Sequence, residues 1–315
     1  MPNGTMILKV QKAMYGLVES AWLWYKELEK HLLSIGYKVS AHDRALFYKN
    51  IMANGECIAS NIASVHVDDI ASAATPNAKG KELEEEFWNS MENKWPGIKR
   101  QTGPHYRHLS WNIYQDPKIM QISKSQRDIQ VVKVSGVEKE QNLPCRSNIL
   151  DSDLNSPKLP DHAIKTFRST LQKVAYARDG RPDIDFAVSY LQTKQNDPTE
   201  QDWKDLSHLL GYLKRFTEKT ITFCPNELQL QGFSDASFNI TQDARSHYGY
   251  VVTLGNCLIS SKGGRIRTIV RSSTEAEISA VNELISDLLW CKDILEEVGY
   301  KQRKIIIFMR ITNLV

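Results

Sequence analysis

An acidic doublet, Asp68-Asp69, lies between two short runs of β-forming residues, and residues 64–70 contain no Lys or Arg. Successive side chains on a strand point to opposite faces, so both carboxylates can converge only if the doublet lies at a tight hairpin turn. The flanking runs, residues 58–67 and 70–74, predict such a hairpin. Two carboxylates suit Mg²⁺ at a phosphoryl-transfer site, but an Asp-Asp pair is also common in a plain polar turn.

A chain of 315 residues with 41% hydrophobic and 24% charged residues can bury sizeable cores, which predicts two or three compact units. Its five cysteines are odd in number and widely scattered, which argues against a disulfide framework and against a zinc site. The sequence shows neither the pattern of a secretory leader nor an apolar run long enough to span a bilayer. We therefore expect an intracellular protein, cytoplasmic or nuclear, that is neither secreted nor in a membrane.

Hydrophobic periodicity predicts an α+β chain in three parts. The first part contains a helix that ends at Gly36, strands joined through Asn54-Gly55, a helix from about residue 79 to 94 and further strands. A Ser-, Asp-, Asn- and Pro-rich stretch then predicts a linker before two or three helices. Three strands, a long amphipathic helix and a last strand follow. The predicted domains are residues 1–146, 147–224 and 225–315.

Short motifs along the chain match one family in order. They are Lys12-Ala13-Met14-Tyr15-Gly16-Leu17, Trp24-Tyr25, Gly36-Tyr37, Asp43, Leu46-Phe47, Val67-Asp68-Asp69-Ile70, Phe167-Arg168-Ser169, Arg181-Pro182-Asp183-Ile184, Phe186-Ala187-Val188, Tyr212-Leu213-Lys214, Ser234-Asp235-Ala236, Gly249-Tyr250 and Ser272-Ser273-Thr274-Glu275-Ala276-Glu277. This set resembles the Pol polyproteins of copia-type LTR retrotransposons. The resemblance implies an incomplete reverse transcriptase palm, a helical thumb or connection region, and a truncated ribonuclease H-like mixed sheet.

The resemblance also implies a polymerase site. Asp68 would be the principal metal ligand and Asp69 its support, with Mg²⁺ as the metal and Mn²⁺ as an alternative. His66 stands where the family usually has tyrosine, beside the primer terminus. The implied partners are an RNA template, a DNA primer, the RNA/DNA hybrid and dNTPs. We expect the strand that carries the family's first aspartate to lie upstream of this chain, which would leave the ligand set incomplete.

A second metal site is implied for ribonuclease H, with Asp235 on the first strand of the last domain and Glu277 on the long helix. Helical periodicity places Glu277 on the sheet-facing stripe and Glu275 about 200° away. Both glutamates also fit capping boxes that begin at Ser272 or Thr274. At the third position the family has an acidic residue, whereas this chain has Arg310, which would repel Mg²⁺.

Four basic residues precede the long helix and are candidate contacts for a phosphate backbone: Lys262, Arg265, Arg267 and Arg271. Gly263-Gly264 among them predicts a flexible turn, and such a basic loop is also common at a solvated edge. The net charge of +3 is too small to decide. Two hypotheses remain: part of an RNA-directed DNA polymerase with ribonuclease H, or a catalytically inactive transposon relic that at most binds nucleic acid.

Overall fold

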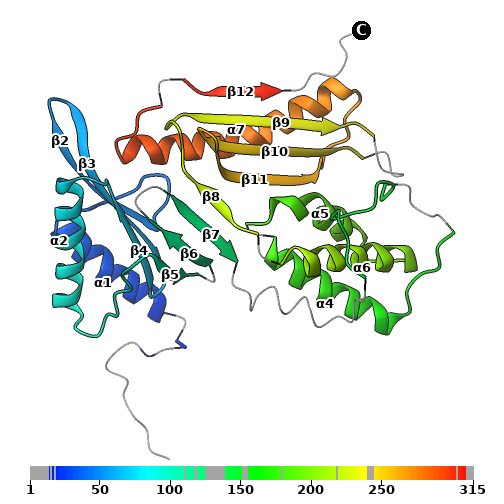
Figure 1. Ribbon diagram of the computed structural model, residues 1–315, viewed down its shortest axis with the longest axis horizontal. Helices are drawn as coiled ribbons and strands as arrows, with labels where there is room; N and C mark the ends of the chain where they lie inside the picture. Colours follow the sequence, from blue (N-terminus) through cyan, green and yellow to red (C-terminus); the bar gives the residue numbers. More distant parts are fainter. Residues whose placement is uncertain are drawn as a thin grey trace, which may run out of the picture. The chain divides into compact units, whose positions relative to one another are not determined.

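The computed structural model describes residues 14, 16–17, 19–109, 111–116, 119–124, 139–150, 155–178, 180–217, 219–239, 245–302 and 304–309. The chain divides into two compact units, Met1–Arg100 with Asp293–Lys301 and Gln101–Lys292 with Gln302–Val315. Both combine helices with antiparallel sheet, which confirms the α+β class (Figure 1). Within the described ranges, no helix has both the length and the apolarity of a membrane span. The predicted domain boundaries remain predictions.

The first unit is built on a four-stranded antiparallel sheet in the order β1-β2-β3-β4. Its elements are α1 (Ser20–Ser34), β1 (Lys38–Val39), β2 (Leu46–Ala53), β3 (Glu56–His66), β4 (Asp69–Ala74) and α2 (Ala78–Lys94). Gly36 follows α1 with a φ of +87°, a conformation that glycine adopts without steric cost. Asn54 and Gly55, with φ of +52° and +80°, form the two-residue turn of the predicted β2–β3 hairpin.

The core of the first unit lies between the two helices and the sheet. Leu28 and Leu32 of α1 are fully buried with Phe47 of β2 and with Phe87 and Met91 of α2. These α1 and α2 residues repeat every four positions, so the amphipathic pattern in the sequence is the one that packs.

The second unit contains two sheets and a group of helices. Its elements are β5 (His105–His108), β6 (Trp111–Gln115), β7 (Met120–Lys124), α4 (Asp161–Ala177), the 3₁₀ turn η1 (Pro182–Ile184), α5 (Asp185–Lys194), α6 (Glu200–Arg215), β8 (Ile221–Phe223), β9 (Leu230–Ser237), β10 (His247–Leu254), β11 (Cys257–Arg265), α7 (Ser273–Glu297) and β12 (Ile306–Met309). One sheet has the order β5-β6-β7-β8, and the other has the order β11-β10-β9-β12. In the latter, β12 pairs with β9 in parallel and the other pairs are antiparallel.

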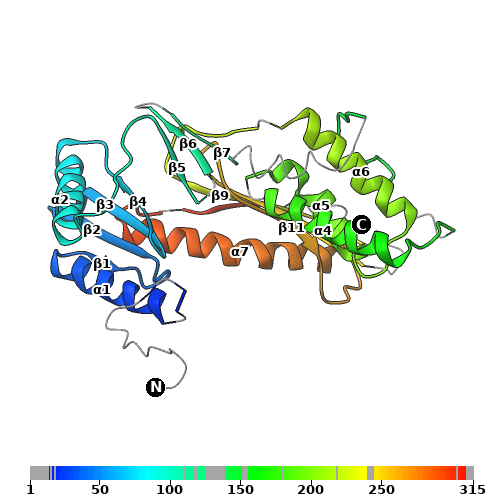
Figure 2. The same cartoon turned by 90° about the horizontal axis from the view of Figure 1, so that it is seen from below.

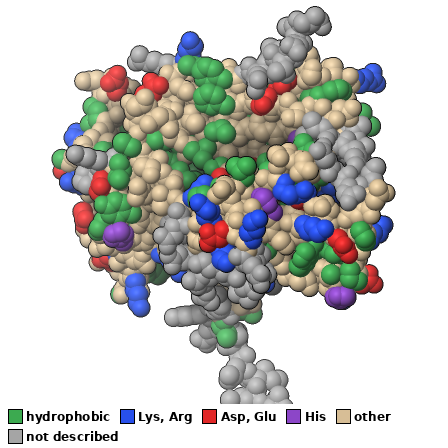
Figure 3. Space-filling model, turned by 45° about the vertical axis from the view of Figure 1, so that its right-hand side comes forward, with side chains coloured by type: hydrophobic (Ala, Val, Ile, Leu, Met, Phe, Trp, Pro, Cys, Tyr) green, Lys and Arg blue, Asp and Glu red, His purple; other side chains and the backbone are tan. Residues whose placement is uncertain are grey.

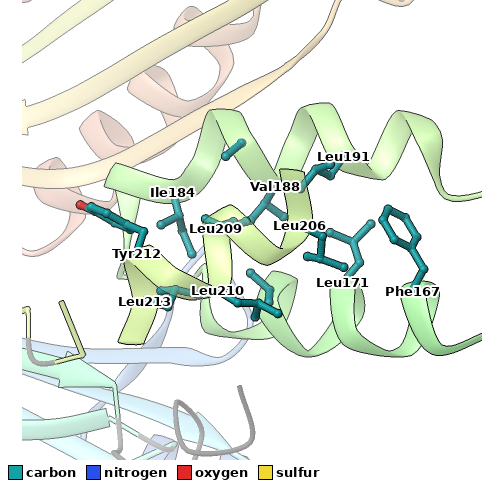
Figure 4. Close-up of a cluster of buried hydrophobic side chains, with 12 residues drawn as sticks. Phe167, Leu171, Ile184, Val188, Leu191, Leu206, Leu209, Leu210, Tyr212 and Leu213 are labelled. Carbon is teal, nitrogen blue, oxygen red and sulfur yellow. The ribbon is translucent and has the colours of Figure 1, made fainter. Parts of the chain in front are cut away.

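The helices α4, α5 and α6 share one apolar core. Phe167 and Leu171 from α4 meet Val188 from α5 and Leu206 and Leu209 from α6, all at most 1% exposed (Figure 4). Thr199 caps the start of α6 with a capping box. The Asp202 backbone N–H donates to the Thr199 hydroxyl, and the Thr199 backbone N–H donates to the Asp202 carboxylate. These helices therefore pack through the apolar residues of their periodic pattern, and Thr199 acts as the cap of α6.

The long helix α7 lies along one face of the β9–β11 strands (Figures 1 and 2). Gly232 of β9 makes this close approach feasible, because a Cβ at that position would lie 2.9 Å from a methyl carbon of Leu284. The helix α5 contacts β11. The last residues of α7 belong to the first unit, where Ser40 Oγ donates to Glu297 Oε2 at 2.5 Å and the Ala41 N–H donates to Oε1 at 2.8 Å.

Candidate functional site

The acidic doublet lies at the tip of the β3–β4 hairpin. His66 and Asp69 are the last paired residues, so Val67 and Asp68 form a two-residue turn. Val67 has a φ of +55°, a left-handed conformation that costs a β-branched residue about 1–2 kcal/mol. Asp68 and Asp69 are both exposed, as is His66. The hairpin predicted around the doublet is confirmed.

A hydrogen bond and an apolar base hold this turn in place. Trp24 Nε1 of α1 donates to the Val67 carbonyl oxygen at 2.6 Å, and the Trp24 ring packs edge-on against Trp95 with 5.0 Å between centroids. One register step below the tip, Val65 pairs with Ile70, and both pack in the core of the unit. The carboxylates therefore project from a fixed support.

The acidic doublet carries two adjacent, solvent-exposed negative charges. Among the described residues, Asp68 and Asp69 form no ion pair with Lys, Arg or His. Such uncompensated, exposed carboxylates are available to a hard cation. Within the same ranges, however, no group of three His, Cys, Asp or Glu side chains is arranged to hold a metal ion. The residues present supply part of a donor set and do not by themselves complete a Mg²⁺ site.

The two residues predicted for the second site lie on different surfaces. Asp235 is exposed on β9, two residues after the exposed Phe233. Along β9, the buried residues Gly232 and Ser234 alternate with the exposed Phe233 and Asp235. The buried pair lies on the face that meets Leu284 of α7. Glu277, by contrast, is only 3% exposed. Asp235 therefore points from the face of β9 opposite to the one that α7 covers.

The cap of α7 is made by residues before Glu277. Ser272 Oγ accepts a hydrogen bond from the Glu275 N–H at 3.1 Å, and Glu275 Oε2 accepts one from the Arg271 N–H at 2.7 Å. Glu275 is exposed, while Glu277 lies on a buried stripe with Ala280 and Leu284. The facing predicted from helical periodicity is confirmed, and the role of Glu277 as a metal ligand stays a prediction.

The four candidate phosphate contacts do not form one loop. Lys262 and Arg265 lie within β11, whereas Arg267 and Arg271 follow it as exposed residues. Lys262 Nζ lies 3.6 Å from Glu283 Oε2 of α7. On the face drawn in Figure 3, Lys and Arg side chains lie among acidic and hydrophobic ones. The four basic residues are therefore divided between strand β11 and the segment that follows it.

The flexible turn predicted at Gly263-Gly264 is wrong, because both glycines lie inside β11 and pair with β10. The physical reason is close packing. A Cβ on Gly263 would lie 3.0 Å from Asp185 Oδ2, and one on Gly264 would lie 3.1 Å from the Tyr248 ring. Glycine in a strand here marks close approach by neighbours and not a change of chain direction.

Similarity to curated proteins extends over nearly the whole chain. It is 28% identical over 297 residues to the retrovirus-related Pol polyprotein from transposon RE2 of Arabidopsis thaliana, an alignment that covers 93% of this chain. It is 23% identical over 314 residues, 96% of this chain, to the Pol polyprotein from transposon TNT 1-94 of Nicotiana tabacum. Its homologues over nearly the whole chain are thus Pol polyproteins of copia-type retrotransposons.

The chain spans about a fifth of the length of these Pol relatives, 20% of the RE2 protein and 23% of the TNT 1-94 protein. A putative transposon Ty5-1 protein of Saccharomyces cerevisiae is 23% identical over 299 residues, and that alignment covers 91% of each chain. No family model matches the chain, and no solved structure matches it significantly.

Some Pol motif residues that marked the family in the sequence form a polar cluster in the helical region. Arg181 Nε and Nη2 each donate to Asp183 at 2.9 Å, and Tyr212 Oη donates to Asp183 Oδ2 at 2.7 Å. Lys219 Nζ lies 3.1 Å from the same oxygen. Burial alone would raise the pKa of Asp183, but the hydrogen bonds from Arg181, Tyr212 and Lys219 outweigh it and lower this pKa to about 2.

Sequence patterns indicate this cluster only through the Arg-Pro-Asp spacing, because Tyr212 lies 29 residues and Lys219 lies 36 residues after Asp183. Two other features of the predicted Pol motifs, Arg310 and the segment 12–13 with Tyr15, lie outside the described residues.

Proposed function

We propose that this chain is the part of a retrotransposon Pol that carries reverse transcriptase and ribonuclease H segments, and that on its own it binds an RNA/DNA hybrid without polymerising or cleaving. The observation that carries the proposal is the β3–β4 tip, where Asp68 and Asp69 are exposed on a fixed two-residue turn and form no ion pair within the described residues.

The sheet order β11-β10-β9-β12, with α7 between β11 and β12 in sequence, supports the ribonuclease H assignment. It is the mixed sheet that the family resemblance implies, with Asp235 on the central strand β9. In this proposal Asp68 and Asp69 face the metal of the polymerase site, and His66 lies beside the primer terminus. Asp235 and Glu277 are the residues that the resemblance assigns to the second site, where this structure has them on different surfaces. The template, primer, hybrid and dNTPs are the proposed partners of the longer Pol product.

Catalysis by this chain alone is not part of the proposal, because the described residues offer no three-donor metal group. We expect no dNTP incorporation when the chain is given a DNA primer on an RNA template with Mg²⁺, and no cleavage of the hybrid. Incorporation by the parent chain that disappears in Asp68→Asn would contradict the inactivity and would establish the site. Cleavage that disappears in Asp235→Asn would do the same for the second site.

Hybrid binding is the activity that we expect to measure. Neutralising Lys262, Arg265, Arg267 and Arg271 with glutamine should weaken binding and should reduce the slope of log affinity against log salt by up to about 0.9 for each phosphate that is no longer neutralised. The matched control neutralises four basic residues on the helices, Lys165, Lys173, Lys204 and Arg215. Equal weakening in both variants would mean that hybrid binding depends on net charge and not on these four positions. Negligible hybrid binding at low salt would contradict the proposal and favour an inactive relic.

A further inference from the structure

A cavity of about 360 Å³ lies inside the second unit, where β11, β8 and the start of α5 meet. None of the proposed catalytic residues lines it. Apolar side chains make most of its wall: Trp111, Pro182, Ile221, Phe223, Leu258 and Ile259. Its volume is near the lower end of the range of about 300–1,000 Å³ for small-molecule sites. A cavity of this size suits a ligand of one aromatic group with a small polar substituent.

The aromatic wall is fixed by a glycine. Gly180, at a φ of +74°, lies so close to Trp111 that a Cβ there would fall 2.3 Å from two carbons of the indole ring. Only a residue without a side chain allows the ring to rest against the backbone at this point. Trp111 therefore has a defined position on the cavity wall, which lowers the entropy lost when a planar ligand packs there.

The polar side of the cavity is an oriented guanidinium. Arg178 Nε lies 3.2 Å from Asp185 Oδ1, and Asp185 is further held by a backbone hydrogen bond from Gly263. The Arg178 side chain is 34% exposed. Among the described residues, no acceptor is paired with its two terminal Nη atoms. A planar guanidinium held by one edge presents its other donors as a fork for a phosphate or carboxylate.

The charges at the cavity favour an anion. Asp185 offsets Arg178, and Lys262, also on the lining, adds a second positive charge whose ammonium lies 3.6 Å from Glu283. We propose that this cavity binds a nucleoside monophosphate, with the base against Trp111 and the apolar wall and the phosphate on the Nη donors of Arg178. A free mononucleotide and a phosphorylated strand end share this chemistry.

Calorimetric titration of the full chain with adenosine 5′-monophosphate, adenosine and inorganic phosphate tests this proposal. We expect saturable binding of the monophosphate and at least tenfold weaker binding of adenosine and of phosphate, because each lacks half of the ligand. Arg178→Gln should weaken monophosphate binding about tenfold and leave adenosine binding unchanged. The matched control is Lys173→Gln, which removes one exposed positive charge from the same stretch of chain.

A second variant fills the cavity without touching the guanidinium. Ile259 is 42% exposed on β11, so Ile259→Trp should fold, as judged by an unchanged circular dichroism spectrum, and should abolish binding of both the monophosphate and adenosine. Displacement of the monophosphate by a 5′-phosphorylated decanucleotide, but not by its unphosphorylated form, would identify a strand end as the ligand. Without displacement by either, the free mononucleotide is the ligand.

Three results would overturn the proposal: no monophosphate binding at millimolar concentration, equal binding by the Arg178→Gln and Lys173→Gln variants, or full binding by Ile259→Trp. Each is separable from the proposed function, since hybrid binding by the same preparation reports on Lys262, Arg265, Arg267 and Arg271 and not on Arg178.

Discussion

Two acidic motifs of this Pol chain behave in opposite ways. In Val67-Asp68-Asp69-Ile70 the carboxylates are exposed at a hairpin tip with no cation paired to them among the described residues. In Arg181-Pro182-Asp183-Ile184 the carboxylate accepts hydrogen bonds from Arg181 and Tyr212 and lies 3.1 Å from Lys219 Nζ. Both motifs match the family, but only the first leaves its oxygens open to a ligand.

The difference separates carboxylates that are solvated at a hairpin tip from a carboxylate that is paired with a buried cation. The Arg181 side chain is 2% exposed, and such a buried charge is tolerated only when a partner compensates for its lost hydration. Asp183 is that partner. At the tip, water can solvate Asp68 and Asp69, so the fold does not depend on their charges. A motif match alone cannot make this distinction, whereas exposure and hydrogen-bond partners can.

Asp183→Asn should have the largest effect on stability. It leaves the buried Arg181 guanidinium without a matching charge, which typically costs about 3–5 kcal/mol. Urea unfolding followed by circular dichroism measures the loss. Asp197→Asn is the matched control, because Asp197 and its partner Lys158 are 63% and 72% exposed, and such pairs contribute about 0–1 kcal/mol. Equal losses of unfolding free energy in the two variants would mean that Asp183 stabilises the fold no more than an exposed carboxylate does.

The pH dependence of stability should identify the same carboxylate. The pKa of Asp183 is lowered from 3.8 to about 2 in the folded chain, so its ionised form stabilises the fold above about pH 4. This contribution, about 2 kcal/mol at 1.36 kcal/mol per pKa unit, should be lost as the pH falls from 5 to 2. The difference in unfolding free energy between the parent chain and Asp183→Asn should shrink over that interval. A constant difference would mean that the pKa of Asp183 is the same in the folded and unfolded states.

Local sequence signals predicted much of the fold. The turn at Asn54-Gly55, the end of α1 at Gly36 and the amphipathic stripes of α2 and α7 depend on residues within a few positions of each other. The hairpin around Asp68 was predictable for the same reason, since β-forming runs flank a polar pair.

Contacts between distant segments were beyond the sequence patterns. Gly263 suggested a turn because nothing nearby in the chain indicates that Asp185, 78 positions earlier, packs against it. The Trp24 hydrogen bond to Val67 joins residues 43 positions apart. Strand alternation places Asp235 on the face of β9 that α7 does not cover, but only once the packing of Gly232 against Leu284 of α7 is known. Side-chain type and spacing nominate site residues, but tertiary packing decides which of them meet.

A substitution that suits the positive φ at the hairpin tip should change the free energy of unfolding by less than Asp183→Asn does. Val67→Asn should stabilise the first unit by about 1 kcal/mol, because asparagine adopts positive φ more readily than a β-branched residue. The Trp24 bond is to the Val67 backbone and is retained. The reverse substitution in the neighbouring turn, Asn54→Val at a φ of +52°, should destabilise by a similar amount. Urea unfolding measures both, and a loss of stability in Val67→Asn would show that the valine side chain itself supports the tip.

The smallest effect on stability is expected where we propose the function. Replacing both Asp68 and Asp69 with asparagine removes two adjacent, exposed like charges that pair with no cation in the described part of the chain, so the urea midpoint should stay unchanged or rise slightly. If the double variant unfolded as readily as Asp183→Asn, the tip would be a structural element and its carboxylates would not be free to bind a metal. An unchanged midpoint would show that the turn does not depend on these two charges, as expected for carboxylates that are free to bind a ligand.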